Sequence, residues 1–183
     1  MVSQIAEKYT EEEILAGCLA ENRHFQEILY RKYADKMYNV SLTYAEDDDE
    51  ACDILQEGFI KVFRKINTFK GDCPIEAWIR RIIINTAIEF FRKRKREFEV
   101  LESYEYSQTG KIDDLLSRIN AKEIIKMVNQ LPAKARMVLK LYAIEGYSHK
   151  EISELLNISE GTSKSQLNRS RSMLKTLISQ NNG

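Results

Sequence analysis

Helix-breaking residues are rare along this chain, and that scarcity restricts the folds open to it. The 183 residues include seven glycines and two prolines, about 5% of the chain, where roughly 12% is usual. All-β folds need frequent turns, which draw heavily on these two residues. Hydrophobic side chains make up 43% of the chain, enough for a packed core. We therefore expect an all-α fold made of a few long helices.

Apolar residues recur at helical spacing through most of the sequence. A first helix is predicted near Thr10, because Thr10 and Glu13 have the spacing of a capping box. Three further stripes at steps of three and four are Phe25, Ile28, Leu29, Tyr33 and Met37; Leu55, Phe59, Val62, Phe63 and Ile66; and Ile79, Ile82, Ile83, Thr86 and Phe90. The last stripe belongs to a long predicted helix from about Ile75 to Arg96.

Periodicity fades between Phe98 and Arg118, where polar residues and a glycine predict a flexible linker. Helices are predicted again over 119–129 and from Pro132, a residue suited to a helix start. We therefore expect two small helical domains, residues 1–97 and 119–183, joined by the linker 98–118.

Several classes of protein are disfavoured by composition. No apolar run approaches the ~18 residues of a membrane-spanning helix, and the N-terminus lacks the basic-then-apolar order of a secretory signal. Cys18, Cys52 and Cys73 are odd in number and far apart. They predict neither a disulfide framework nor a zinc site, and they suit a reducing compartment. We expect a cytoplasmic protein that needs no metal or cofactor.

Charge is strongly segregated, although 28 basic and 28 acidic side chains cancel. Residues 1–79 hold 9 basic and 16 acidic side chains, and residues 80–97 hold 7 and 2. Residues 98–121 hold 2 and 5, and residues 122–183 hold 10 and 5. Two basic segments separated by acidic ones predict two contacts with an anionic partner such as nucleic acid.

Two helix caps near the C-terminus predict a helix-turn-helix. Ser148 and Glu151 form a capping-box pair, Asn157 and Ile158 make the turn, and Ser159 caps the second helix. An ordinary corner between two helices is the alternative on this pattern alone.

The second helix of this motif has two different faces. A stripe expected to be buried consists of Ser163, Leu167, Ser170 and Leu174. The opposite face carries polar side chains that can reach base edges, namely Thr162, Ser165, Gln166, Arg169 and Ser172. Lys164 and Arg171 flank the buried stripe and suit phosphates. No acidic residue follows Glu160, so we expect this helix to face DNA.

The helix around Asp53 has an acidic outer face. Asp53 and Glu57 are four residues apart, a like-charge pair that mildly destabilises an isolated helix. Gln56 and Ile60 lie on the same side. This strip is either a docking site for a basic partner or a solvated face in which Lys61 partly neutralises Glu57.

The long helix from Ile75 combines cations with an aromatic side chain and an amide. Opposite its buried stripe it carries Arg80, Arg81, Asn85 and Arg92, with Trp78 near its start, and it ends in a basic run over 92–96. Cations are favourable at any helix C-terminus, but five exceed that need. Backbone neutralisation beside a stacking surface is typical of binding to single-stranded or melting DNA.

These segments together resemble the conserved regions of bacterial RNA polymerase sigma factors. Region 2.2 is matched by Ala51, Asp53, Gln56, Glu57, Phe59, Ile60, Lys61, Val62 and Phe63. Regions 2.3 and 2.4 are matched by Trp78, Ile79, Arg80, Arg81, Ile82, Asn85 and 92–96. Region 4 is matched by Leu131, Pro132, Arg136, Val138, Leu139, Gly146, Tyr147, Ser148, Glu151, Ile152, Leu155, Leu156, Ile158, Ser159, Glu160, Gly161, Thr162, Lys164, Ser165 and Leu167. The linker is too short for a middle domain, as in the extracytoplasmic-function (ECF) group.

The resemblance implies a sigma factor, a non-catalytic subunit that directs core RNA polymerase to promoters. Docking on the β′ clamp helices is implied for Asp53, Gln56, Glu57 and Ile60. Binding and melting of the −10 element is implied for Phe69 and its loop to Pro74, Trp78, Arg80, Arg81, Asn85, Arg92 and Lys93. Reading of the −35 element is implied for Thr162, Lys164, Ser165, Gln166 and Arg169. The implied partners are the β′ and β subunits, promoter DNA and an anti-sigma factor, with no small-molecule substrate.

Two positions depart from the family pattern, and two other functions compete with it. Ser163 stands where an apolar residue is common, which slightly weakens the packing of the recognition helix. Gln166 stands where arginine is common, so the −35 sequence that this helix reads does not follow from the family pattern. A stand-alone helix-turn-helix regulator would form dimers on palindromic sites, but nothing resembles a dimer seam. A nucleic-acid-modifying enzyme would need a metal cluster, glycine loop or nucleophile–base pair. His24 and His149 are isolated in the sequence, and we expect His149 to be exposed.

Overall fold

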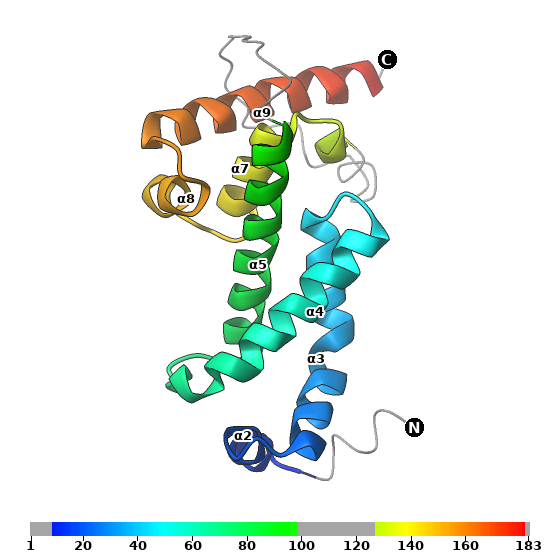
Figure 1. The fold of residues 1–183 in the computed structure, drawn as a ribbon. Coiled ribbons are helices and arrows are strands. Elements are labelled where there is room, and N and C mark those ends of the chain that lie inside the picture. The colour runs from blue at the N-terminus through cyan, green and yellow to red at the C-terminus, as the bar shows by residue number, and fades with distance from the viewer. Residues whose placement is uncertain (1–8, 99–126, 182–183) are drawn as a thin grey trace. The chain divides into compact units, whose positions relative to one another are not determined.

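The computed structural model describes residues 9–98 and 127–181, and every regular element within them is a helix (Figure 1). These elements are α2 (Glu11–Leu19), α3 (Arg23–Tyr44), α4 (Asp48–Lys65), the 3-10 turn η1 (Ile66–Thr68), α5 (Ile75–Phe98), α7 (Ala133–Ala143), α8 (His149–Leu156) and α9 (Glu160–Asn181). The all-α prediction is thus confirmed for the described residues. Of the predicted linker 98–118 only Phe98 is described, as the last residue of α5, and nearly all of the predicted helix 119–129 also lies outside the described residues.

The chain divides into two compact units, Met1–Val100 and Leu101–Gly183. The first unit holds α2, α3, α4, η1 and α5, and the second holds α7, α8 and α9. Across the two described ranges, no helix combines the length and apolar character needed to cross a membrane.

Side-chain caps define where several helices begin. At α2, Thr10 Oγ1 accepts from Glu13 N at 3.2 Å, and the Glu13 carboxylate accepts from Thr10 N at 2.8 Å. The same reciprocal box joins Ser148 and Glu151 at α8, at 3.2 and 2.9 Å. Ser159 caps α9 as predicted. Each cap satisfies amide groups that a helix N-terminus leaves without a partner.

The core of the first unit lies among α3, α4 and α5, which pack against one another, while α2 packs on α3. The side chains exposed by no more than 3% include Ile28, Leu29, Met37, Ile54, Phe59, Val62, Ile79, Ile83 and Ile88. The predicted stripes therefore form the interior, apart from Phe25, Phe63, Ile82 and Phe90, which are half-buried. Burial of apolar area on this scale is the main force that stabilises such a bundle.

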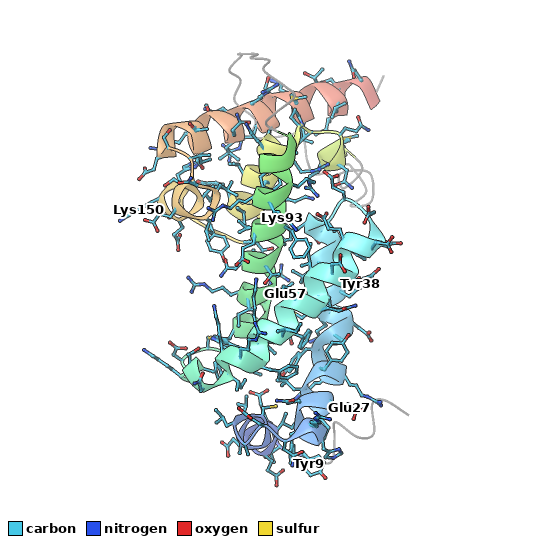
Figure 2. All side chains as sticks on the ribbon, viewed as in Figure 1. Tyr9, Glu27, Tyr38, Glu57, Lys93 and Lys150 are labelled. Atoms are coloured by element: carbon cyan, nitrogen blue, oxygen red, sulfur yellow. The ribbon has the colours of Figure 1, made fainter. Side chains whose placement is uncertain are left out.

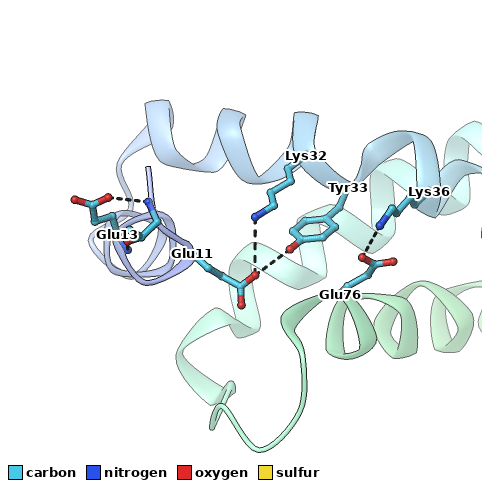
Figure 3. Close-up of polar contacts among 7 residues, drawn as sticks. Glu11, Glu13, Lys32, Tyr33, Lys36 and Glu76 are labelled. Atoms are coloured by element: carbon cyan, nitrogen blue, oxygen red, sulfur yellow. Dashed lines mark hydrogen bonds and ion pairs between the residues drawn. The ribbon is translucent and has the colours of Figure 1, made fainter. Parts of the chain in front are cut away.

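Polar contacts join the helices of this unit at its edge (Figure 3). Glu11 of α2 accepts a hydrogen bond of 3.2 Å from the Tyr33 hydroxyl of α3, and Lys32 Nζ lies 3.9 Å from the same carboxylate oxygen. Burial and the Glu11 carboxylate both raise the pKa of Tyr33. Lys36 of α3 and Glu76 of α5 form an ion pair of 2.7 Å. These contacts link α2 and α5 to α3 at the surface of the unit.

The second unit is built by α9, which packs against both α7 and α8. Its buried side chains include Met137, Val138, Leu141, Ile152, Leu156, Leu167 and Ile178. The turn between α8 and α9 passes through Asn157, whose φ is +52°, in the left-handed region that asparagine tolerates. Helix α7 ends at Ala143, three residues before the predicted stop at Gly146, which has a φ of +74°. The predicted helix-turn-helix is therefore formed by α8 and α9.

Candidate polymerase and nucleic-acid interfaces

The four side chains predicted to dock polymerase lie along the outer side of α4, and we call them the α4 strip. Asp53, Gln56 and Ile60 are exposed. Glu57, which is labelled in Figure 2, is half-buried. Ile60 exposes 44% of its surface, whereas its neighbour Phe59 exposes 2%. Helix spacing places Asp53, Glu57 and Ile60 on successive turns of one side. The strip thus combines acidic groups with an apolar side chain open to a partner.

The acids of the α4 strip are weakly neutralised. Lys61 Nζ lies 2.7 Å from Glu89 of α5 and 3.9 Å from Glu57. The short contact of Lys61 is therefore to the neighbouring helix, because the pair with Glu57 is at the distance limit of an ion pair. Among the described residues, Asp53 has no ion pair. The carboxylate of Asp53 is consequently available to a basic partner.

An aromatic pair stands where the loop after η1 meets α5. The rings of Phe69 and Trp78 are tilted by 56°, with their centroids 5.5 Å apart. Both side chains are half-buried, and the loop residues 70–74 between them are exposed. Gly71 has a φ of +73°, which only glycine adopts readily. The pair offers ring surface beside an exposed loop, a geometry suited to stacking an unpaired base.

The cations predicted to meet DNA on α5 differ in exposure. Arg81, Arg92 and Lys93 are exposed, while Arg80 and Asn85 are half-buried. Lys93 is labelled in Figure 2. The side chains of 95 and 96 lie outside the described residues.

Arg94 belongs to the same basic run, but it binds acidic side chains of its own unit. Its Nη1 donates to both carboxylate oxygens of Glu50 at 2.7 and 2.8 Å, and its Nη2 lies 3.3 Å from Glu46. The side chains of Arg94 and Glu50 are each 18% exposed. Asp47, in the same acidic run, caps α4 by accepting from Glu50 N at 2.8 Å. This Arg94 clasp joins the start of α4 to the end of α5, a role that the sequence pattern did not reveal.

The buried stripe predicted for α9 is present over most of its length. Ser163 and Ser170 are fully buried and Leu167 is 3% exposed. Leu174 is only half-buried, so the predicted stripe is weaker at its end. On the predicted outer face, Thr162 and Ser165 are exposed and Gln166, Arg169 and Ser172 are half-buried, and Lys164, which flanks the stripe, is exposed. Lys164 Nζ lies 3.9 Å from Glu160, a loose pair within one turn.

Three predicted DNA contacts carry an unsatisfied polar atom. Within the part of the chain that the structure describes, the buried side-chain polar atoms without a hydrogen-bond partner are Asn85 Oδ1, Gln166 Oε1 and Arg169 Nε. Buried polar groups without partners cost about 1–3 kcal/mol each, so they are rare unless a ligand or water completes them. All three belong to residues predicted to contact DNA, although the atoms themselves are buried.

His149 is neither isolated nor fully exposed, which corrects the expectation from the sequence. Its Nδ1 lies 2.9 Å from Ser163 Oγ, on the helix that follows. Sequence spacing could not show this contact, because it joins two helices across the turn. The same hydrogen bond accounts for a buried serine at a position where an apolar residue is common.

Comparison with known proteins places both units in one class. The family model "Sigma-70 region 2" matches residues 29–97, and "Sigma-70, region 4" matches residues 121–174. These two regions in this order define a sigma factor of the sigma-70 type.

Curated relatives narrow this class further. The chain is 25% identical to the ECF RNA polymerase sigma-E factor of Haemophilus influenzae over 186 residues, covering 95% of this chain and 98% of the relative. It is 28% identical to the ECF RNA polymerase sigma factor SigM of Bacillus subtilis over 151 residues, which cover 81% of this chain and 92% of that relative. The chain belongs to the sigma-70 family, in its ECF group, and is a sigma factor for transcription initiation.

A solved structure has a similar fold. The sigma factor RpoE from Bartonella quintana, crystallised with the anti-sigma factor NepR, matches with a TM-score of 0.52 and 21% sequence identity. The match covers 84% of this chain and 96% of that chain.

Proposed function

We propose that this sigma factor binds core RNA polymerase through the α4 strip, binds the −10 element with α5 and the loop before it, and reads the −35 element with α9. The observation that carries the proposal is the α4 strip, where Asp53 and Gln56 are exposed beside Ile60, which exposes 44% of its surface. It acts as a regulatory subunit in the cytoplasm, and the polymerase supplies the chemistry.

Docking on polymerase follows from the chemistry of the α4 strip. Asp53 has no intramolecular ion pair within the described ranges, and Glu57 has only a loose one with Lys61. Ile60, on the same side of the helix, adds exposed apolar surface. An apolar centre with charged neighbours is typical of protein interfaces. The partner expected on such a strip is a basic surface, and the resemblance to the family implies that it is the β′ clamp helices.

Binding of the −10 element combines cations with ring stacking. Arg81, Arg92 and Lys93 project from α5 and neutralise phosphates of the separating strands. The rings of Phe69 and Trp78 provide a surface for an extruded base. Binding energy gained only when the strands separate favours the melted state.

Reading of the −35 element is assigned to the outer face of α9. Thr162, Ser165, Gln166 and Arg169 present hydroxyl, amide and guanidinium groups of the kind that pair with base edges in the major groove. Lys164 is exposed and positioned for a phosphate. An anti-sigma factor is a further proposed partner, by analogy with the factor crystallised from Bartonella quintana.

Gel filtration with bacterial core RNA polymerase tests the docking proposal. The wild-type chain is expected to co-migrate with core, and Asp53→Lys/Glu57→Lys is expected to abolish co-migration while leaving the helical circular dichroism unchanged. The matched control is Glu12→Lys/Asp35→Lys, which makes the same charge change at exposed acids outside the strip. Unchanged binding by the α4 variant would refute the docking role. A chain that ignores core and elutes as a dimer would instead support a stand-alone regulator.

A further inference from the structure

A fully buried hydroxyl lies inside the helix-turn-helix. Ser163 of α9 is 0% exposed, and its Oγ lies 2.9 Å from Nδ1 of His149, the first residue of α8. A buried hydroxyl without a partner is costly, so the imidazole satisfies Ser163. In return, the serine fixes one edge of the ring.

The face of the same imidazole ring is also held. Tyr142, at the end of α7, stacks on His149 with ring centroids 4.7 Å apart and an interplanar angle of 22°. The guanidinium carbon of Arg171 lies 5.9 Å from the centroid of the Tyr142 ring. Three helices therefore meet at one imidazole, and its orientation is set by contacts on two sides.

One polar atom of His149 is left over by this arrangement. Nδ1 faces Ser163, whereas no hydrogen bond from Nε2 occurs within the described residues, and Nε2 is not among the buried atoms that lack partners. When the Ser163 hydroxyl donates to Nδ1, the neutral ring carries its proton on Nε2. The free edge is then a hydrogen-bond donor.

The charged groups that act on His149 include two cations and one acid. Burial, Lys164 and Arg171 lower the pKa of His149, and Glu160 opposes them; all three charged residues belong to α9, while Tyr142 is the titratable group facing the ring from α7. Mutually repelling cationic groups gathered at one place are stabilised when an anion binds among them. The first helix of a helix-turn-helix crosses the DNA backbone, and His149 begins that helix.

We propose that His149 binds a backbone phosphate of the −35 duplex through Nε2, with Ser163 and Tyr142 holding the ring in position. The inference rests on the proposed reading of the −35 element by α9 and adds a contact that carries no base information. A bound phosphate favours the imidazolium over the neutral ring, so DNA binding takes up a proton. Affinity then increases as pH falls through the pKa of the bound state.

The test is the affinity of the holoenzyme, core polymerase carrying the full chain, for a promoter duplex between pH 8.0 and 6.0. His149→Gln is the matched variant, because a glutamine amide can still bond Ser163 but does not titrate. The ratio of wild-type to His149→Gln affinity is expected to rise about 3–10-fold over this range, since a pKa shift of one unit corresponds to a factor of ten. At pH 6.0 the wild type is expected to show a salt dependence steeper by about one phosphate contact. A ratio that is flat with pH would overturn the proposal.

A second variant separates orientation from packing. Ser163 is buried and cannot reach DNA itself, so Ser163→Ala is expected to reduce the pH-dependent gain by half or more. Added to His149→Gln, the same change is expected to have no further effect on the pH profile. An undiminished gain in Ser163→Ala would refute the positioning by Ser163.

The −35 sequence itself provides the remaining control. His149→Gln is expected to lower the affinity of the holoenzyme by the same factor on matched and substituted −35 sequences, because all of these duplexes have the same phosphates. If the wild type does not discriminate between −35 sequences, the proposed function of α9 fails. If it discriminates and the affinity ratio stays flat with pH, only the His149 contact fails.

Discussion

Lys140 of α7 is 7% exposed, and its environment disfavours the charged ammonium group. Burial, with a further contribution from Arg136, lowers the pKa of Lys140 from 10.5 to about 8. Below pH 8 the ammonium is charged in both the folded and the unfolded state, so the folded state bears the full cost of burying it. Between pH 8 and 10.5 the unfolded state binds more protons, and stability must rise with pH.

We therefore expect the free energy of unfolding of the second unit to rise by roughly 1–3 kcal/mol between pH 7 and pH 10. Lys140→Met, which keeps the length of the side chain, is expected to remove most of this rise. Urea denaturation followed by circular dichroism at both pH values measures it. An equal rise in the variant would show that another group is responsible.

Arg169 is the residue whose loss should reveal base reading most directly. Arg169→Ala is expected to weaken promoter binding by about 1–3 kcal/mol if the guanidinium pairs with a guanine. The measurement compares holoenzyme affinity for the preferred −35 sequence with that for sequences substituted at each base pair. A loss of the same size on every sequence would make Arg169 a phosphate contact instead.

At the scale of the elements, the Arg94 clasp is a contact between two helices that local sequence spacing does not predict. The guanidinium joins α5 to the start of α4 with two short hydrogen bonds to Glu50. Arg94→Ala is expected to lower the free energy of unfolding of the first unit by about 1–3 kcal/mol, because it leaves a partly buried carboxylate without its cationic partner. Lys93→Ala, the exposed neighbour, is expected to change it by less than ~0.5 kcal/mol.

A double-mutant cycle with Glu50→Gln isolates the Arg94–Glu50 interaction, because it removes the effects that each change has by itself. The coupling energy is expected to exceed ~0.5 kcal/mol. Strict additivity of the two changes would contradict the clasp.

The crossing of α2 and α3 depends on a glycine. A Cβ added at Gly17 would lie 2.1 Å from Cδ2 and 2.6 Å from Cβ of Phe25, and Phe25 Cβ cannot move by side-chain rotation. Gly17→Ala is thus expected to destabilise the first unit by about 1–3 kcal/mol despite the better helix propensity of alanine.

Gly161 of α9 is the control, since its nearest neighbour beyond the adjacent residues, Ser159 Oγ, is 3.6 Å from the added atom. Gly161→Ala is expected to leave stability unchanged or raise it by up to ~1 kcal/mol. Chemical denaturation of both variants checks the pair. Equal effects at the two glycines would contradict the close approach of α2 and α3.

At the scale of the whole molecule, each unit carries its own hydrophobic core, and we expect two unfolding transitions. Trp78 is the single tryptophan of the chain and lies in the first unit, so its fluorescence reports that unit alone. Leu141→Ala creates a cavity in the second unit, where Leu141 is 0% exposed, and is expected to cost about 2–5 kcal/mol there. The midpoint measured by Trp78 fluorescence should stay unchanged while part of the circular dichroism transition shifts. A joint shift of both signals would indicate one cooperative unit.

Helices, caps and the buried stripes could be read from the sequence because they depend on residues three or four positions apart. The capping pairs of Thr10 with Glu13 and of Ser148 with Glu151 are examples. The same local spacing placed Asp53 and Ile60 on one side of α4, and Thr162 and Gln166 on the outer face of α9. The roles assigned to these residues in binding polymerase and DNA stay predictions.

Contacts between distant residues were decided by the tertiary structure. Arg94 and Glu50 are 44 residues apart, Lys61 and Glu89 are 28 apart, and His149 and Ser163 are 14 apart. The sequence by itself determined which side chains are charged and which helix face carries them, because both follow from local spacing. Which cation forms an ion pair within its own unit depends on how the helices pack, because an ion pair forms only where packing brings its two groups within about 4 Å.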